Sequence, residues 1–338
     1  MRILLHTNAL NERGTTVAVR DYANGLSQSG HEVSIAYDTS DSSNVEAIKK
    51  QVDNENTTYG YSNFDVFARQ NAKEWDVAYF MKYGNNDGKL IPGIPNIVHA
   101  VFQAYDPHGE RYLYISEWLS KKMRIQNLKN LIKLSPRGLD SLKRKKFDFL
   151  PYIVSLPLHE SSLRAEWGFP EGAIIGGRHG AKDTFDVPKV HRAIQEILCG
   201  NEKVCFVFAN TNKFIEHPRV KFLPTLLSRL ETSNYLSSLD FYLHARHRGE
   251  TFGLSLLEAM LCKVPIFSYS VGVDGNHRYL LKGSKNSLFD SGDSLKMFVN
   301  QLQNYEDVQT NFEIASSFSP EVVMQYWAQI LTELVEQK

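Results

Sequence analysis

The sequence predicts an α/β protein built from two successive domains, and three observations support this prediction. The chain has 338 residues, which is enough for two hydrophobic cores. Short apolar segments alternate with segments of helical periodicity in both halves, as in parallel sheets covered by helices. Pro151 and Pro157 bracket a short apolar stretch, after which the alternation restarts. We therefore expect domains at 1–152 and 153–317 and a final helix at 318–338.

The first half begins with a strand, a glycine-containing loop, a helix and a parallel strand. The apolar run at 2–6 leads into a polar loop with Gly14, and helical spacing then continues to Gly30. The segment 38–63 is rich in Ser, Asn, Asp and Thr, and we expect it at the surface. The remaining expected elements are strands at 31–38, 76–82, 96–102 and 112–116, and a helix at 117–126.

The second half repeats the alternation. Its expected strands are at 173–177, 203–210, 219–223, 240–245 and 264–270, and its expected helices are at 187–200, 225–239, 254–261 and 294–303. The final helix begins at Ser319-Pro320, where Ser is a suitable cap and Pro suits the first helical position.

Composition excludes several classes of function. The chain has 38 basic and 38 acidic residues, and this balance argues against binding nucleic acid over its whole surface. The basic run 143–146 is interpreted as a solvated loop; peripheral contact with an anionic membrane is the less favoured alternative. The three cysteines lack disulfide or zinc spacing. No apolar run suits a signal peptide or a membrane span, so we expect a cytoplasmic protein.

The loop after the strand at 173–177 carries glycines and two cations. In open parallel sheets, ligands bind at the carboxyl ends of strands. Gly176, Gly177 and Gly180 are expected to let backbone approach a ligand, while Arg178 and Lys182 suit a diphosphate. The glycine fingerprint of dinucleotide enzymes and the P-loop do not occur after any strand, and the chain has no D-x-D.

The stretch "RHRGETFGLSLLEAM" carries two glutamates at the start of a helix. Gly253 would expose first-turn N–H groups to an anionic or hydroxyl-rich ligand, with Glu250 beside them. Glu258 is expected to share an apolar stripe with Leu254 and Leu261, where a carboxylate needs donors such as ribose hydroxyls. The structural alternative is that Glu258 pairs with a cation such as Arg246 and that Glu250 only caps the helix.

Together these segments resemble the retaining glycosyltransferases of family 4, which have the GT-B fold. "GETFGLSLLEAMLCKVPIF" is similar to their E-x7-E signature, and "GGRHGAKDTFD" resembles the donor-diphosphate loop of one branch. "NERGTTVAVRDYA" resembles the first-lobe loop, and "FSPEVVMQYW" resembles the last helix. The resemblance implies two Rossmann-like domains facing each other across a cleft, with the C-terminal helix crossing back to the first.

The resemblance also implies roles for individual residues. The implied catalytic residues are His99, near the transferred sugar, Arg178 and Lys182, on the diphosphate, and Glu250, on the sugar hydroxyls. The implied substrate-binding residues are Gly14, Thr15, Asn210, Leu223, Thr251, Phe252, Gly253, Leu254 and Glu258, with Glu258 on the ribose. No metal or other cofactor is expected.

The sequence therefore predicts a metal-independent, retaining hexosyltransferase. Its expected partners are a UDP- or GDP-sugar donor and a saccharide or glycoconjugate acceptor, with no nucleic acid. Two alternatives remain open, which are a non-catalytic nucleotide-sugar-binding protein and a nucleotide-sugar epimerase on the same fold. The base, the sugar, the acceptor and the oligomeric state do not follow from these residues.

Overall fold

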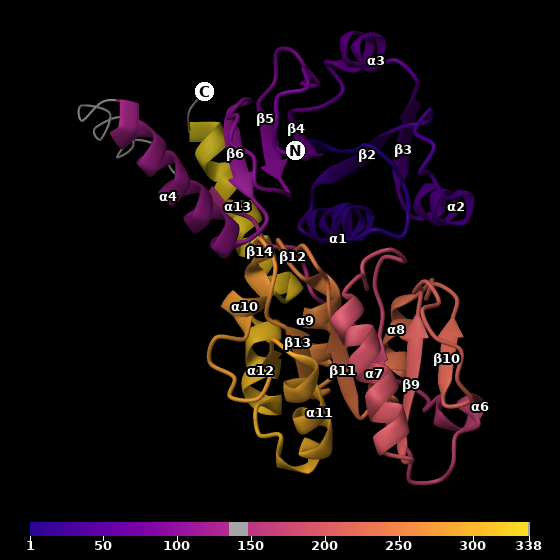
Figure 1. Ribbon diagram of the computed structural model, residues 1–338. Helices are drawn as coiled ribbons and strands as arrows, with labels where there is room; N and C mark the ends of the chain where they lie inside the picture. Colours follow the sequence, from indigo (N-terminus) through magenta and orange to yellow (C-terminus); the bar gives the residue numbers. More distant parts are fainter. Residues whose placement is uncertain (135–147, 337–338) are drawn as a thin grey trace. The chain divides into compact units, whose positions relative to one another are not determined.

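The computed structural model describes residues 1–134 and 148–336, and the chain folds into two compact units. The first unit is Met1–Ile153 together with Pro320–Lys338, and the second is Val154–Ser319. Each contains a parallel sheet covered by helices, which confirms the predicted α/β class (Figure 1). The basic run at 143–146 lies outside the described residues. None of the described helices is long and apolar enough to cross a membrane.

The described part of the first unit has a seven-stranded parallel sheet in the order β3-β2-β1-β4-β5-β6-β7. Its strands are β1 (Arg2–Thr7), β2 (Glu32–Asp38), β3 (Thr57–Tyr61), β4 (Val77–Lys82), β5 (Asn96–Ala100), β6 (Arg111–Tyr114) and β7 (Asp148–Phe149). Its helices are α1 (Gly14–Gln28), α2 (Glu46–Glu55), α3 (Phe64–Asn71), α4 (Glu117–Leu134) and α13 (Pro320–Glu336).

Alternate residues of β4 show how helices cover both faces of this sheet. Phe80 packs against Phe64 of α3, with ring centroids 6.0 Å apart. The preceding residue, Tyr79, points to the opposite face, because neighbouring side chains in a strand alternate. Its ring lies 5.8 Å from that of Tyr22 of α1 and 5.2 Å from that of Trp327 of α13. The sheet is therefore buried on both sides, as its apolar strands predict.

The C-terminal helix α13 belongs to the first unit, although the whole of the second unit precedes it in the chain (Figure 1). Trp327 is buried against Tyr22, and Glu333 forms an ion pair with Arg111, with Oε2 2.9 Å from Nη2. Helix α1 approaches α13 closely at Gly25, where a Cβ would lie 2.6 Å from Met324 Sδ. This packing explains why the last helix returns to the first sheet.

The expectation of surface structure at 38–63 missed two elements. The segment contains α2 and β3, and α3 follows it directly. Val52 is the only buried residue of α2, and β3 is the edge strand of the sheet. Elements that bury so little carry few apolar residues, so their periodicity is weak.

The described sheet of the second unit has six parallel strands in the order β10-β9-β8-β11-β13-β15. They are β8 (Ile174–Arg178), β9 (Val204–Ala209), β10 (Val220–Leu223), β11 (Phe241–His244), β13 (Ile266–Tyr269) and β15 (Leu288–Phe289), and β12 (Gly249–Glu250) pairs separately with β14 (Asp274–Gly275). The α-helices are α6 (Arg164–Trp167), α7 (Pro188–Gly200), α8 (Arg229–Ser237), α9 (Leu254–Leu261), α10 (Asn276–Leu280), α11 (Gly292–Asn300) and α12 (Val308–Ser316).

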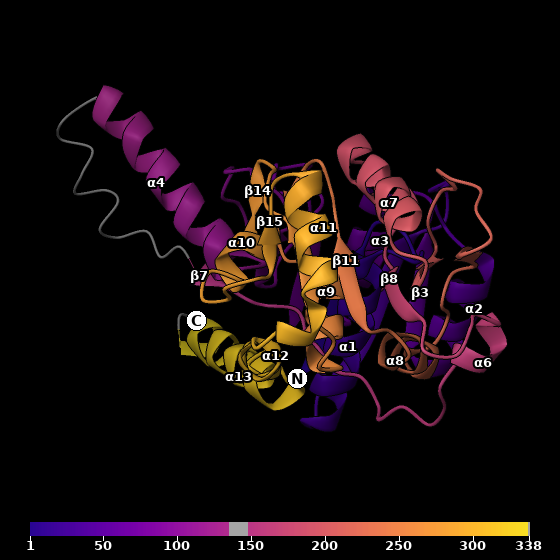
Figure 2. The same ribbon diagram turned by 60° about the horizontal axis from the view of Figure 1, so that its bottom comes forward.

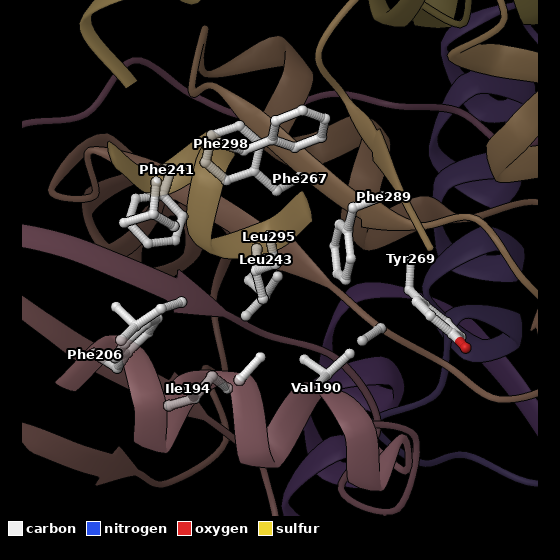
Figure 3. Packing of buried hydrophobic residues seen from close by; sticks show 14 of the residues in the cluster. Val190, Ile194, Phe206, Phe241, Leu243, Phe267, Tyr269, Phe289, Leu295 and Phe298 are labelled. Atoms are coloured by element: carbon white, nitrogen blue, oxygen red, sulfur yellow. The ribbon is translucent and has the colours of Figure 1, made fainter. Parts of the chain in front are cut away.

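One face of this sheet is covered by α7 and α11, which contact each other (Figure 2). Their apolar side chains, including Ile194 and Leu295, join Phe241 and Leu243 of β11 in a single buried cluster (Figure 3). The intervening residue of β11, Tyr242, points to the other face, which carries α9. Helix α9 is thus held by the sheet on the side away from this cluster.

The strand order reverses at β8, which lies between β9 and β11. The chain winds from β8 to β10 in one direction and then crosses back to β11 on the other side. Such a reversal is where open α/β sheets bind ligands, because the loops from the two neighbouring strands diverge there. In the second unit these are the loops that follow Arg178 and His244. In the first unit the reversal lies at β1, whose following loop leads to Gly14.

Candidate functional site

Two loops of the second unit meet at the strand-order reversal. The loop after β8 carries Asp186, whose carboxylate accepts a 2.7 Å hydrogen bond from the backbone N–H of His247, in the loop after β11. Tyr242 of β11 also donates its hydroxyl to the carbonyl of His179, at 2.8 Å. The structure therefore brings together the diphosphate loop and the two-glutamate segment that the sequence analysis singled out separately.

Arg178 ends β8, and its guanidinium is directed into its own loop. Nη1 donates to Thr211 Oγ1 at 2.7 Å, and Nη2 donates to Thr184 Oγ1 at 2.5 Å and to the Ala181 carbonyl at 3.0 Å. The residue is 5% exposed, and burial lowers its pKa from the usual value. The expected direct contact of Arg178 with a diphosphate does not match this geometry, because its terminal nitrogens already hold the loop.

The packing around this loop explains why glycine is required at the positions before it and within it. A Cβ at Gly176 would lie 2.2 Å from the Phe241 ring, and one at Gly177 would lie 2.6 Å from the Tyr235 hydroxyl. Gly180 has a φ of +149°, which side chains rarely adopt. The expectation that Gly176 and Gly177 admit a ligand is therefore corrected, since they admit neighbouring aromatic side chains instead.

Lys182, Asn210 and Leu223 lie at the same end of the sheet. The Lys182 side chain is exposed, and its carbonyl accepts a 3.1 Å hydrogen bond from the backbone of Asn212. Asn210 has a φ of 45°, a left-handed conformation that Asn tolerates better than most residues, and it donates to the Gly180 carbonyl at 2.9 Å. Its own N–H donates to the carbonyl of Leu223, at 3.1 Å. These contacts tie the ends of β9 and β10 to the loop that carries Lys182.

Glu250 lies in an ion-paired network. Its carboxylate oxygens lie 3.2 Å from His244 Nε2 and 3.0 Å from Arg246 Nη1. Burial by itself would raise the pKa of Glu250, but His244 and Arg246 lower it to about 2. The alternative in which Glu250 caps the following helix is not what the structure shows, because α9 has Gly253 as its cap and no side-chain cap bond.

The three residues after Glu250 lead into α9, which begins at Leu254. Thr251 and Phe252 are buried, and the Phe252 ring packs edge-on against Phe318 at 5.5 Å. Gly253 has a φ of 91°, a conformation that other residues rarely adopt, so glycine is needed here for the backbone. Leu254 is the half-buried first residue of the helix. The first-turn N–H groups of an eight-residue helix therefore begin directly beside Glu250.

Glu258 does not lie on the packing stripe that the sequence analysis proposed. The buried side of α9 consists of Leu256, Leu257, Ala259 and Met260, whereas Leu254, Glu258 and Leu261 are half-buried. The helix is packed against β11, β13 and α12, which shifts its buried face. The Glu258 side chain is 15% exposed, and its Oε2 lies 3.3 Å from Nε2 of His179. A histidine from the loop after β8 therefore lies beside Glu258, and Arg246 forms an ion pair with Glu250.

His99, in the first unit, occupies a different environment from the one expected. It lies within β5, is 0% exposed and hydrogen-bonds through Nδ1 to the hydroxyl of Tyr79. Its ring is surrounded by Tyr22, Tyr79 and Tyr152, and burial lowers its pKa to about 3. A neutral histidine inside an aromatic cluster is typical of a core residue, and this position does not offer a contact for a sugar.

Gly14 and Thr15 start α1, immediately after the loop that follows β1. Both are half-buried. The loop is held by Thr16, whose hydroxyl accepts a 3.0 Å hydrogen bond from the N–H of Asn11, and by the Asn11 side chain, which accepts one from the N–H of Arg13. Gly14 and Thr15 therefore follow β1, at the strand-order reversal of the first unit. The corresponding strand of the second unit is β8.

Several polar residues around the glutamates were not predicted from the sequence. His179 faces Glu258, His244 faces Glu250, and His277 accepts a 3.4 Å hydrogen bond from the Glu250 N–H. His179 and His244 lie in the segments already singled out, so their positions could have been noticed. His277 could not, because it approaches only through the pairing of β12 with β14. Among the described residues, no three His, Cys, Asp or Glu side chains are placed to share a metal ion.

Comparison with known proteins finds a family match in the second unit and solved structures with a similar fold. Residues 186–306 match the family described as Glycosyl transferases group 1. A search of the curated proteins finds no match. Among solved structures, HepE from Anabaena, in complex with UDP-glucose, has a TM-score of 0.71 at 15% identity, covering 98% of this chain and 100% of its own.

Two further solved structures cover the chain from end to end. Sucrose-phosphate synthase from Thermosynechococcus elongatus has a TM-score of 0.68 at 15% identity, covering 100% of both chains. A putative UDP-N-acetylglucosamine 2-epimerase from Listeria monocytogenes has a TM-score of 0.60 at 9% identity, covering 100% of this chain and 97% of its own. Identities this low show a shared fold only. Within the second unit, residues 186–306 therefore match the glycosyl transferases group 1 family, and the chain has the GT-B fold.

Proposed function

We propose that the protein is a retaining hexosyltransferase that uses a UDP- or GDP-sugar donor and a saccharide or glycoconjugate acceptor. The observation that carries this proposal is the meeting of two loops at the reversal of strand order in the second unit. One loop supplies Lys182, and the other supplies Glu250 and the start of α9, with Glu258 one turn further on. The family match covers the second of these loops, and the HepE structures that contain UDP and UDP-glucose support a nucleotide-sugar donor.

The charges and donors of this region suit a sugar nucleotide. The N–H groups at the start of α9 and the exposed Lys182 would bind the diphosphate, because both present positive charge without a need for metal. Glu258 would accept hydrogen bonds from the ribose, and Glu250 from hydroxyls of the transferred sugar. Asn210 and Leu223 would lie beside the base. Arg178 takes the role of holding the loop that carries Lys182.

The proposed reaction proceeds on one face of the sugar. The bond between the anomeric carbon and the β-phosphate oxygen breaks while the acceptor oxygen bonds the same carbon from the same side. The acceptor proton passes to the departing phosphate oxygen, so the products are the glycoside and the nucleoside diphosphate. Lys182 and the α9 N-terminus would stabilise the charge that develops on the diphosphate. The lack of any D-x-D in the sequence supports a reaction without a bound metal.

The acceptor is proposed to bind the first unit, in which Gly14 and Thr15 are the proposed substrate-binding residues. Both lie at the carboxyl end of β1, where an open parallel sheet binds ligands. The balance of 38 basic and 38 acidic residues favours a saccharide or glycoconjugate over nucleic acid.

Donor screening tests the proposal. The purified chain is titrated with UDP, GDP and ADP in thermal-shift assays, and the stabilising nucleotide fixes the donor panel. Transfer to a glycan array is then followed by NMR of the anomeric proton, with EDTA present and absent. We expect one nucleotide to raise Tm and the product to keep the donor's anomeric configuration with EDTA present. An inverted product, or transfer abolished by EDTA, would contradict the proposed mechanism.

A second candidate, an epimerase, is favoured by the shared fold with the putative UDP-N-acetylglucosamine 2-epimerase. The same assay separates the candidates. An epimerase would change the configuration of the donor sugar without an acceptor, and a non-catalytic protein would bind the nucleotide with neither transfer nor epimerisation.

A further inference from the structure

His179 has no role in the proposed reaction, yet its ring lies beside the carboxylate of Glu258. Its Nε2 lies 3.3 Å from Glu258 Oε2, and the histidine side chain is 12% exposed. Nε2 is buried and makes no well-aligned hydrogen bond with any residue that the structure describes. A buried ring nitrogen that faces a carboxylate at this distance without an aligned hydrogen bond calls for an explanation.

The histidine is held firmly in this position. Tyr235 accepts a hydrogen bond from the N–H of Arg178 and donates to the carbonyl of Val207, while Tyr242 donates to the carbonyl of His179 itself. The rings of both tyrosines pack edge-on against His179, at 6.3 and 5.8 Å. The imidazole therefore cannot swing away without breaking buried contacts, and its nitrogen stays directed at the carboxylate.

Burial and the charge of Arg178 lower the pKa of His179 to about 3. The ring is therefore neutral at physiological pH and carries one N–H. A proton on Nε2 can be donated to Glu258, which orients the carboxylate without neutralising it. A lysine or arginine here would instead form an ion pair and occupy the carboxylate oxygens more strongly. A neutral histidine supplies a single N–H, which uses only one of the acceptor positions that a carboxylate has.

We propose that His179 is a positioning residue that fixes the Glu258 carboxylate for the 2′- and 3′-hydroxyls of a ribose, and so makes the donor site selective for ribonucleotides over 2′-deoxyribonucleotides. This inference rests on the proposed function, in which Glu258 binds the ribose. The two hydroxyls of a ribose lie on the same side of its ring, so one carboxylate can accept from both only when its orientation is set. His179 sets it from the opposite loop.

A double-mutant cycle with two ligands tests this inference. The nucleoside diphosphate that the wild type binds, chosen from UDP, GDP and ADP, is compared with its 2′-deoxy form by calorimetry. We expect His179→Phe to weaken binding of the ribonucleotide by about tenfold, the value of one hydrogen bond to a charged group. Binding of the 2′-deoxy form should change much less, so the preference for ribose falls. In the Glu258→Gln background the His179 substitution should have little further effect.

Three controls keep the result interpretable. His179→Gln, which retains an N–H donor, should restore much of the preference for ribose, and His179→Leu replaces the phenylalanine variant if that variant does not fold. His159→Phe changes an exposed histidine of the same unit and should alter neither Kd. Equal weakening for both nucleotides, or additive effects of His179 and Glu258, would overturn the inference while the proposed function stands. Absence of nucleotide binding by the wild type would instead count against the proposed function.

Discussion

The guanidinium of Arg178 donates a 2.7 Å hydrogen bond to the hydroxyl of Thr211, 33 residues further along the chain. The bond joins the end of β8 to the end of β9. With the bonds to Thr184 and Ala181, it closes the loop that carries Lys182. Arg178, at the end of β8, therefore has a structural role that Lys182, in the loop, does not share. Substituting each residue in turn should distinguish the effect on stability from the effect on activity.

Arg178→Lys should destabilise the protein as well as reduce its activity. A lysine has one nitrogen and cannot reach Thr211, Thr184 and Ala181 together, so buried acceptors lose their donors. We expect the free energy of unfolding to fall by about 2–4 kcal/mol, as is typical when a buried hydrogen-bonded charge network is broken. Urea unfolding measures this change. Arg192→Lys, on the exposed side of α7, is the control. An unchanged urea midpoint for Arg178→Lys would show that the guanidinium bonds do not hold the loop.

Lys182→Met should reduce activity while leaving the stability of the protein almost unchanged. The side chain is exposed, and its loss should change the free energy of unfolding by less than about 0.5 kcal/mol. If Lys182 stabilises the departing diphosphate, kcat for transfer should fall about 10²-fold, as is typical when one stabilising group is removed from a transition state. Lys189→Met, seven residues further on and also exposed, is the matched control. Normal turnover in the Lys182 variant would assign the leaving-group charge to another group.

Glu250→Gln should remove a stabilisation that depends on pH. His244 and Arg246 hold the pKa of Glu250 at about 2, below the usual 4.5. A carboxyl group whose pKa is depressed stabilises the fold above its unfolded pKa, and this contribution is lost as pH falls toward the folded value. The difference between wild type and Glu250→Gln should therefore be about 3 kcal/mol at pH 6 and should shrink from pH 4.5 toward pH 2.5.

Urea unfolding across this pH range measures the difference. Glu216→Gln, at an exposed position of the same unit, provides the baseline. A difference that stays constant with pH would mean that the ion pairs of Glu250 do not stabilise the folded state.

The apolar strands of both sheets could be predicted because parallel strands are buried on both faces. Runs such as the one at β9 have no polar positions, and all six of its residues are buried. Helix α12 could not be predicted in the same way. Its buried residues are Asn311 and Ala315, which do not make a strong apolar pattern. Elements that pack through few or polar residues leave little periodic signal in the sequence.

The sequence predicted which positions along the chain belong to the candidate site, but not the directions of their side chains. Spacing and residue type placed Lys182, Glu250 and Glu258 near one another, because strand-end loops of a parallel sheet converge. The same reasoning could not show that Arg178 points into its own loop or that His179 faces Glu258. Those directions depend on Thr211 and Tyr235, which come from distant elements. Side-chain direction at a loop is set by tertiary contacts, and local sequence contains little of that information.

Four buried histidines should make the fold sensitive to mild acid. Burial lowers the pKa of His6, His99, His179 and His277 to about 3, and two of them lie in each unit. Between pH 6.5 and pH 3 the unfolded chain therefore binds more protons than the folded protein, so stability falls as pH falls. Each histidine contributes up to about 1.4 kcal/mol per pH unit in this window. We expect the urea midpoint to drop steadily from pH 6.5 to pH 5, above the range in which Glu250 titrates. His6→Gln should reduce the slope of the free energy of unfolding against pH by the equivalent of about one proton. Equal urea midpoints at pH 7 and pH 5 would contradict the neutral state of these rings.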